Sequence, residues 1–147
     1  MIQINELRIG NIVQVVNPEY HPKLLNVPLV VGGISPALTP LDCKPTFSIS
    51  LENLNQEPNT FYENCSQFIK YVFPIPLTEE ILLKCGHQRK ASTVFFADRF
   101  KLFWRKEYKY WYVTDRETNT YITKVEFLHE WQNTWFVLQG TELSVQL

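Results

Sequence analysis

Residues 100–113 read FKLFWRKEYKYWYV, and this stretch decides the fold of the second half of the chain. Aromatic residues, which favour strands, fill both sides of Lys106-Glu107. A two-residue loop at Lys106-Glu107 predicts the cross-strand pairs Arg105–Tyr108, Phe103–Tyr110 and Lys101–Tyr112. We expect the same pairing from a four-residue loop, and only a three-residue loop would break it. The stretch therefore predicts an antiparallel β-hairpin.

The two faces of this hairpin carry different residues, because side chains alternate across a sheet. The predicted core face consists of Phe100, Leu102, Trp104, Lys109, Trp111 and Val113. The opposite face, which we call the basic-aromatic face, consists of Lys101, Phe103, Arg105, Tyr108, Tyr110 and Tyr112. Unstacked bases can stack on such rings while Lys and Arg hold phosphates. Aromatic cross-strand pairs covered by Lys and Arg stems are also common structural features, so a solvated or partner-covered face is the alternative.

The charge of the chain is unevenly distributed. Fourteen basic and fifteen acidic residues give a net charge of −1, which excludes a global basic field that would attract nucleic acid. Ten of the basic residues and four of the acidic ones lie between Lys84 and Lys124, so this segment carries +6 and the remainder −7. Any electrostatic attraction to an anionic partner is therefore expected to be local.

The remainder of the second half predicts helices on either side of the hairpin. Thr78 is a helix N-cap followed by two acidic residues, and Gly86 ends this short helix. Strands are predicted at 93–97, 100–105 and 108–114, with a fourth at 120–123 and a closing strand at 143–147. A final helix is predicted from about 124 to 138, with an apolar stripe made of Leu128, Trp131, Trp135 and Leu138.

The first half is β-like and interrupted by prolines. Its strands are predicted at 11–16, 29–34, 47–51 and 68–73, with loops at 17–22, 35–40 and 52–64 and a turn or bulge at Gly32-Gly33. Short strands without a helix suggest a small SH3-like barrel. The fold class is predicted as α+β, with a β-rich subdomain at 1–76 and a subdomain at 77–147 that has a three- to four-stranded sheet. We expect both to share one core.

Metal, cofactor and nucleophile patterns are missing from the sequence. The candidate ligands are three cysteines and three histidines: Cys43, Cys65, Cys85, His21, His87 and His129. Cys85-Gly86-His87 brings two of them close, but no second pair follows at zinc-site spacing. The five glycines form neither a phosphate-binding loop nor a dinucleotide fingerprint. The sequence predicts free thiols, no metal, no cofactor and no catalytic residues.

His129 and Asn133 lie four residues apart on the predicted final helix. One interpretation makes His129 a general base that an amide orients. The other is a polar ladder that fixes the helix in place, and it is favoured because no nucleophile or second catalytic group accompanies the pair.

Three segments resemble a known family when taken together and in this order. They are residues 7–13 (LRIGNIV), 74–86 (PIPLTEEILLKCG) and 127–143 (FLHEWQNTWFVLQGTEL). They resemble a family of small uncharacterised proteins of Bacteroides-type bacteria, often encoded in prophages and other mobile elements. Residues 19–63 do not share this resemblance. The resemblance implies a phage or mobile-element setting and supplies no catalytic residue.

The function expected from the sequence is a non-enzymatic accessory or interaction protein, with a protein partner or a second copy of itself bound. Binding of single-stranded nucleic acid through the basic-aromatic face is the first alternative, and a small enzyme with an unrecognised site is the second. No run of about 18 apolar residues exists and no basic region precedes an apolar run at the start. The sequence therefore predicts a cytoplasmic protein without membrane contact.

Overall fold

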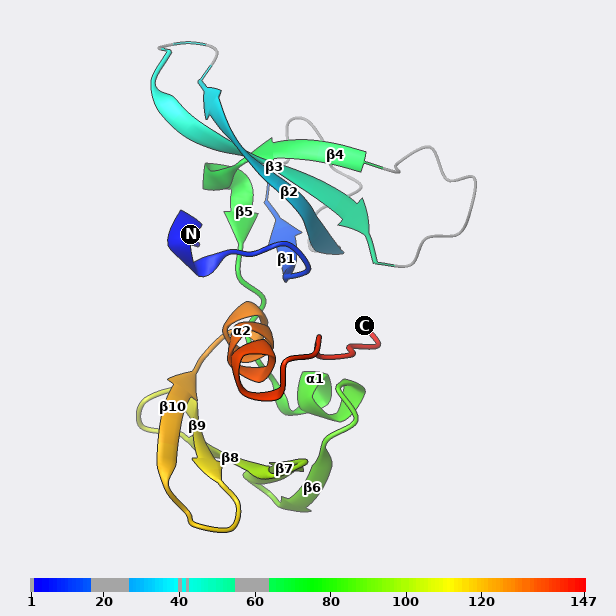
Figure 1. The fold of residues 1–147 in the computed structure, drawn as a ribbon, viewed down its shortest axis with the longest axis vertical. Coiled ribbons are helices and arrows are strands. Elements are labelled where there is room, and N and C mark those ends of the chain that lie inside the picture. The colour runs from blue at the N-terminus through cyan, green and yellow to red at the C-terminus, as the bar shows by residue number, and fades with distance from the viewer. Residues whose placement is uncertain (1, 17–26, 40, 42, 55–63) are drawn as a thin grey trace. The chain divides into compact units, whose positions relative to one another are not determined.

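The computed structural model describes residues 2–16, 27–39, 41, 43–54 and 64–147. It divides into two compact units, Met1–Ile75 and Pro76–Leu147, which we call unit 1 and unit 2. Each unit contains a five-stranded antiparallel sheet, and the described residues include two α-helices, both in unit 2 (Figure 1). The fold is therefore mainly β, and the predicted α+β class is wrong.

Unit 1 is a sheet with the strand order β4-β3-β2-β1-β5. Its strands are β1 (Ile12–Val15), β2 (Pro28–Leu38), β3 (Pro45–Asn53), β4 (Asn64–Phe68) and β5 (Val72–Phe73). Two 3-10 turns, Ile4–Glu6 and Ile69–Tyr71, complete the described elements, and the second divides the strand predicted at 68–73. Among the described residues no ladder joins the edge strands β4 and β5, so the predicted SH3-like barrel is replaced by an open sheet.

The long hairpin of β2 and β3 differs from the prediction of a loop at 35–40. β2 continues to Leu38, and Pro36 lies opposite Phe47 of β3. The predicted irregularity at Gly32-Gly33 is confirmed as a register shift between Val31 and Gly33. The loop predicted at 17–22 lies outside the described residues, as do residues 55–63 of the loop predicted at 52–64.

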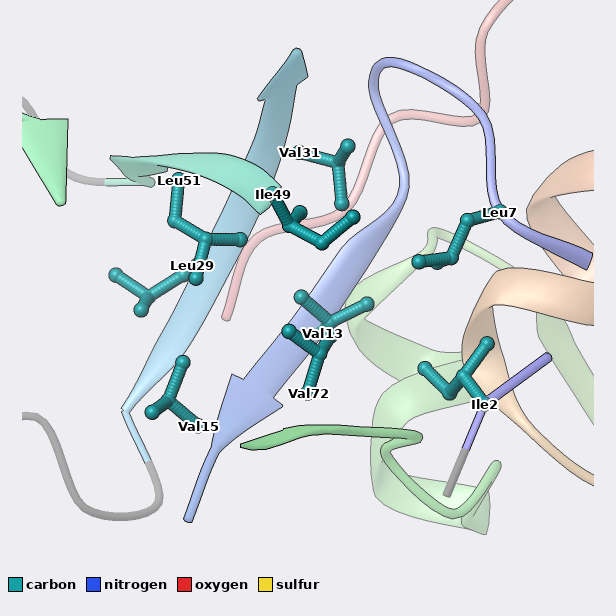
Figure 2. Close-up of a cluster of buried hydrophobic side chains, with 9 residues drawn as sticks. All are labelled: Ile2, Leu7, Val13, Val15, Leu29, Val31, Ile49, Leu51 and Val72. Carbon is teal, nitrogen blue, oxygen red and sulfur yellow. The ribbon is translucent and has the colours of Figure 1, made fainter. Parts of the chain in front are cut away.

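Alternation along these strands builds the core of unit 1. Side chains that point to one face of the sheet meet residues from the N-terminal segment (Figure 2). The buried cluster consists of Ile2, Leu7, Val13, Val15, Leu29, Val31, Ile49, Leu51 and Val72. All of them are aliphatic, so this core is held by burial of apolar surface.

Unit 2 is an antiparallel meander with the strand order β10-β9-β8-β7-β6, accompanied by two helices. Its elements are α1 (Glu79–Lys84), β6 (Gln88–Ala91), β7 (Val94–Ala97), β8 (Phe100–Arg105), β9 (Tyr110–Asp115), β10 (Tyr121–Val125) and α2 (Leu128–Gln139). The sheet has five strands where three or four were predicted, because β6 was missed. Residues 124–125 belong to β10 rather than to the final helix, and 143–147 form no strand.

Local geometry confirms the predicted start of α1 and the predicted end of α2, whereas α2 begins at Leu128 and not at about 124. Thr78 Oγ1 accepts a hydrogen bond from the Ile81 amide at 3.3 Å, as an N-cap should. Gly140 follows α2 with a φ of 70°, the left-handed conformation in which glycine is favoured. In the predicted stripe of α2, Leu128 and Trp131 are buried and Trp135 is half-buried, whereas Leu138 is exposed.

The core of unit 2 lies between α2 and the inner face of the sheet. The buried residues of that face are Phe95, Ala97, Phe100, Leu102, Trp111, Val113 and Val125. The Phe100 ring contacts Trp131 and Trp135 edge-on, with centroids 6.3 and 6.1 Å apart. All four tryptophans of the chain, at 104, 111, 131 and 135, belong to unit 2.

Trp111 fixes the segment that precedes α1 onto the sheet. Its indole Nε1 donates a buried hydrogen bond of 2.7 Å to the carbonyl oxygen of Leu77. The Leu77 amide donates to the carbonyl oxygen of Glu126 at 2.9 Å, and Pro76 forms a β-bridge with Phe127. The two segments beside the sheet are therefore tied both to each other and to β9.

We expect Leu102→Ala to lower the free energy of unfolding by about 2–5 kcal/mol, because Leu102 is fully buried and the change leaves a cavity. Urea denaturation with hydrogen exchange at the β8 and β9 amides measures the loss in unit 2. Val94→Ala, on the half-buried outer face of β7, is the control and should cost clearly less. Equal losses for the two variants would contradict the assignment of the inner face as core.

Candidate nucleic-acid interface

The structure brings the predicted basic-aromatic face together, although the register of the hairpin differs from the prediction. Residues 106–109 form the loop between β8 and β9. The observed cross-strand pairs are Arg105–Tyr110, Phe103–Tyr112 and Lys101–Thr114. The predicted partners are therefore wrong by two residues, and so is the expectation that a four-residue loop keeps the same pairing. A shift of two residues keeps every side chain on its face, so the membership of the face is unaffected.

Tyr108 lies in the turn rather than in a strand. The amides of Tyr108 and Lys109 both donate to the carbonyl oxygen of Arg105, at 3.1 and 2.9 Å. Lys109 takes a φ of 56°, and this left-handed residue leads the chain back into β9. Lys109 is exposed in the same turn, so it is not part of the buried core that was predicted for its face.

The rings of the face form a continuous aromatic ladder across three strands. Phe103 and Tyr112 are stacked, with centroids 5.2 Å apart and planes 7° apart. The Tyr110 ring lies 5.1 Å from that of Tyr112 and 5.6 Å from that of Tyr108. Tyr121 of β10 extends the ladder, with its centroid 5.5 Å from Tyr112. The sequence does not predict Tyr121 as part of this face, because the strand expected at 120–123 has no predicted neighbour in the sheet.

Cations lie over this ladder. The Arg105 guanidinium is 5.2 Å from the centroid of Phe103 and 5.5 Å from that of Tyr112. Lys101 Nζ lies 5.9 Å from the Phe103 centroid, and Lys124 Nζ lies 5.1 Å from that of Tyr110. Lys124 was also missed, because it was predicted to begin the final helix, whereas it pairs with Tyr112 across β10 and β9. These distances are within the range of cation–π attraction.

The ends of the ladder are more exposed than its middle. Tyr108 is 64% exposed and Tyr121 is 54% exposed. Lys101, Phe103, Tyr110 and Tyr112 are half-buried, and Arg105 is exposed. Base stacking needs an accessible ring face, so Tyr108 and Tyr121 are the rings best placed to offer one.

Hydrogen bonds shift the pKa values of two groups on β9. Hydrogen bonding to Tyr112, with 3.1 Å between the two hydroxyl oxygens, raises the pKa of Tyr110 to about 12, so this residue stays neutral. Asp115 at the end of β9 has its pKa lowered, first by the Thr118 amide and then by Arg99. The Arg99 Nη2 atom lies 2.9 Å from the Asp115 carboxylate and balances its charge.

The other candidate residues of the sequence are engaged in packing. His87 Nε2 accepts a 2.9 Å hydrogen bond from Trp131 Nε1, and burial lowers the pKa of His87 to about 4. Burial raises the pKa of the Cys85 thiol to about 12, so it is no nucleophile at neutral pH. Cys43 is an exposed free thiol, and the Cys65 side chain lies outside the described residues. No group of three potential metal ligands occurs in the described part of the chain.

His129 and Asn133 lie one turn apart on α2, as predicted. The His129 side chain is buried, and its ring stacks on Phe127 with centroids 6.0 Å apart. Asn133 is half-buried. Burial argues against a general base, which would need access to a substrate, and the polar ladder stays a prediction.

No protein-family model, no curated protein and no solved structure matches this chain. The resemblance to a mobile-element family of Bacteroides-type bacteria therefore stays a prediction. Among the described residues, no helix combines the length and the apolar character needed to cross a membrane.

The buried His87 predicts a loss of stability in acid. The unfolded chain binds a proton on this histidine near pH 6.5, whereas the folded chain resists protonation until about pH 4. Stability is therefore fully present above pH 6.5 and falls as the pH decreases toward 4, by up to about 3 kcal/mol. Urea denaturation at a series of pH values measures this slope. His87→Gln keeps a hydrogen-bond acceptor for Trp131 but removes the group that titrates. If stability depended on pH equally strongly in this variant, His87 would not be the cause of the acid sensitivity.

Proposed function

We propose that the chain is a non-enzymatic binding protein that takes up single-stranded nucleic acid on the basic-aromatic face of unit 2. The observation that carries the proposal is the aromatic ladder, which has exposed rings at both ends and cations over its middle. Rings and cations interleaved in this way supply the two interactions that sequence-tolerant binding of unpaired strands requires.

Each part of the face has a separate role in this proposal. Bases stack on Tyr108 and Tyr121, the two most exposed rings of the ladder. Lys101, Arg105 and Lys124 neutralise phosphates along the strand. The stacked pair of Phe103 and Tyr112 keeps these groups in place, because cross-strand aromatic pairs stiffen a sheet. A duplex would bind more weakly, since its bases are not available for stacking.

A protein partner on the same face is the second candidate. Aromatic residues and arginine are enriched in protein interfaces, and Arg105 lies directly over two rings. The resemblance to a mobile-element family supports an accessory role in a phage or similar element under either candidate. A cytoplasmic location, predicted from the sequence, remains part of the proposal.

We expect the full chain to bind single-stranded DNA and RNA of about 20 nucleotides more tightly than the corresponding duplex. Three phosphate contacts predict that the affinity falls with salt, with a log–log slope of about −2. Tyr108→Ala should weaken binding about tenfold, because a stacked base contributes about 1–3 kcal/mol. Arg105→Gln should weaken it and make the salt slope shallower, because one of three phosphate contacts is lost. Filter-binding titrations at several salt concentrations measure all of these values.

Lys70→Gln is the matched control for Arg105→Gln. Lys70 is an exposed cation of unit 1, and its Nζ lies 4.7 Å from the Tyr71 ring centroid. It therefore has the same kind of cation–ring contact as Arg105 but lies outside the basic-aromatic face. This variant should bind as the parent does. Absence of binding at low salt would overturn the nucleic-acid proposal and favour the protein partner.

A further inference from the structure

Unit 2 contains a cavity on the inner side of its sheet, opposite the basic-aromatic face. Its volume is about 600 Å³, within the range of small-molecule sites. Its apolar walls consist of Pro76, Leu77, Trp104, Trp111 and Phe127. Trp104 and Trp111 are cross-strand partners of β8 and β9, so they point away from the aromatic ladder.

The wall of this cavity is held rigidly. The Trp111 indole is fixed by its hydrogen bond to Leu77, and its ring contacts Phe95 edge-on at 5.6 Å. The Trp104 ring lies 5.2 Å from Trp111 and is half-buried, so part of it faces the cavity. Two indoles and the Phe127 ring therefore line one preformed space, which suits a flat apolar group.

The mouth of the cavity has an excess of positive charge. Lys106 and Lys109 both line it, and neither forms an ion pair within the described ranges. Of the two carboxylates in the lining, Glu79 is paired with Arg89 at 3.1 Å. Glu126 is the other carboxylate, and no ion pair within the described ranges includes it. Two lysines and one unpaired carboxylate therefore set the charge at the mouth. An anionic group is thus favoured over a cationic one at the mouth.

The backbone at Lys109 provides a separate indication. Its φ of 56° lies in the left-handed region, where glycine or asparagine is preferred over a residue such as lysine. A glycine there would relieve the backbone but remove the cation from the cavity mouth. Strained positions of this kind are often retained for function.

We propose that this cavity binds a small aromatic carboxylate. The ring of the ligand lies against Trp104 and Phe127, and its carboxylate contacts Lys106 and Lys109. This site is separate from the nucleic-acid interface and does not depend on it.

The test is isothermal titration calorimetry of the full chain with three probes that share one ring system. They are 2-naphthoate, the neutral 2-naphthalenemethanol and the cationic 2-naphthylmethylammonium. We expect 2-naphthoate to bind at least about tenfold more tightly than the alcohol, and the ammonium compound to bind no better than the alcohol. Indole N–H resonances of Trp104 and Trp111 should shift with 2-naphthoate. No binding, equal affinities or preference for the cation would each overturn the proposal.

Substitutions at the cavity mouth test which side chains hold the carboxylate of the ligand. Lys109→Gly should weaken 2-naphthoate binding about tenfold while the melting temperature stays the same or rises, because glycine tolerates the left-handed backbone. Asn119→Gly is the matched control, since Asn119 has the same φ of 56° in another turn, and it should leave the affinity unchanged. Glu126→Gln should strengthen binding, and Arg105→Gln on the opposite face should have no effect. An unchanged affinity in Lys109→Gly would contradict the proposal.

Discussion

The buried hydrogen bond from Trp111 to the Leu77 carbonyl is the interaction on which the rest of unit 2 depends. A buried indole N–H must find an acceptor, and here the acceptor belongs to the segment that leads into α1. This contact holds Trp111 inward on β9. Because neighbouring residues alternate, Tyr110 and Tyr112 must then point outward. The wall of the cavity and the aromatic ladder are thus two consequences of one fixed residue.

The faces of the hairpin could be predicted from the sequence, but its register could not. The face on which a side chain lies depends on whether the number of residues between the paired positions is odd or even. A change of two residues in the loop length leaves this unchanged. The pairing depends on the loop itself, and Lys106-Glu107 has none of the residues that specify a tight turn. The left-handed Lys109 carries no local indication of its conformation. Tyr121 and Lys124 could not be predicted, because they join the face only through the pairing of β10 with β9, which local sequence does not specify.

The errors in fold class have similar physical causes. All four residues of β6 are exposed, so this edge strand lacks the alternation by which strands are recognised. In unit 1, Pro36 suggested a loop because proline lacks a ladder donor. β1 pairs only with residues 28–30 of β2, so among the described residues none pairs on that side with the end of β2 that holds Pro36. Proline is tolerated at such an edge, and the strand continues.

The confinement of all four tryptophans to unit 2 decides what intrinsic fluorescence can report. Tryptophan emission follows the environment of those indoles, so a change in emission during denaturation records the unfolding of unit 2. The described core of unit 1 is aliphatic and contains no indole that would report its loss directly. A single sigmoidal emission curve is therefore no evidence that both units unfold together. A tryptophan placed in unit 1 would make its transition visible in the same spectrum.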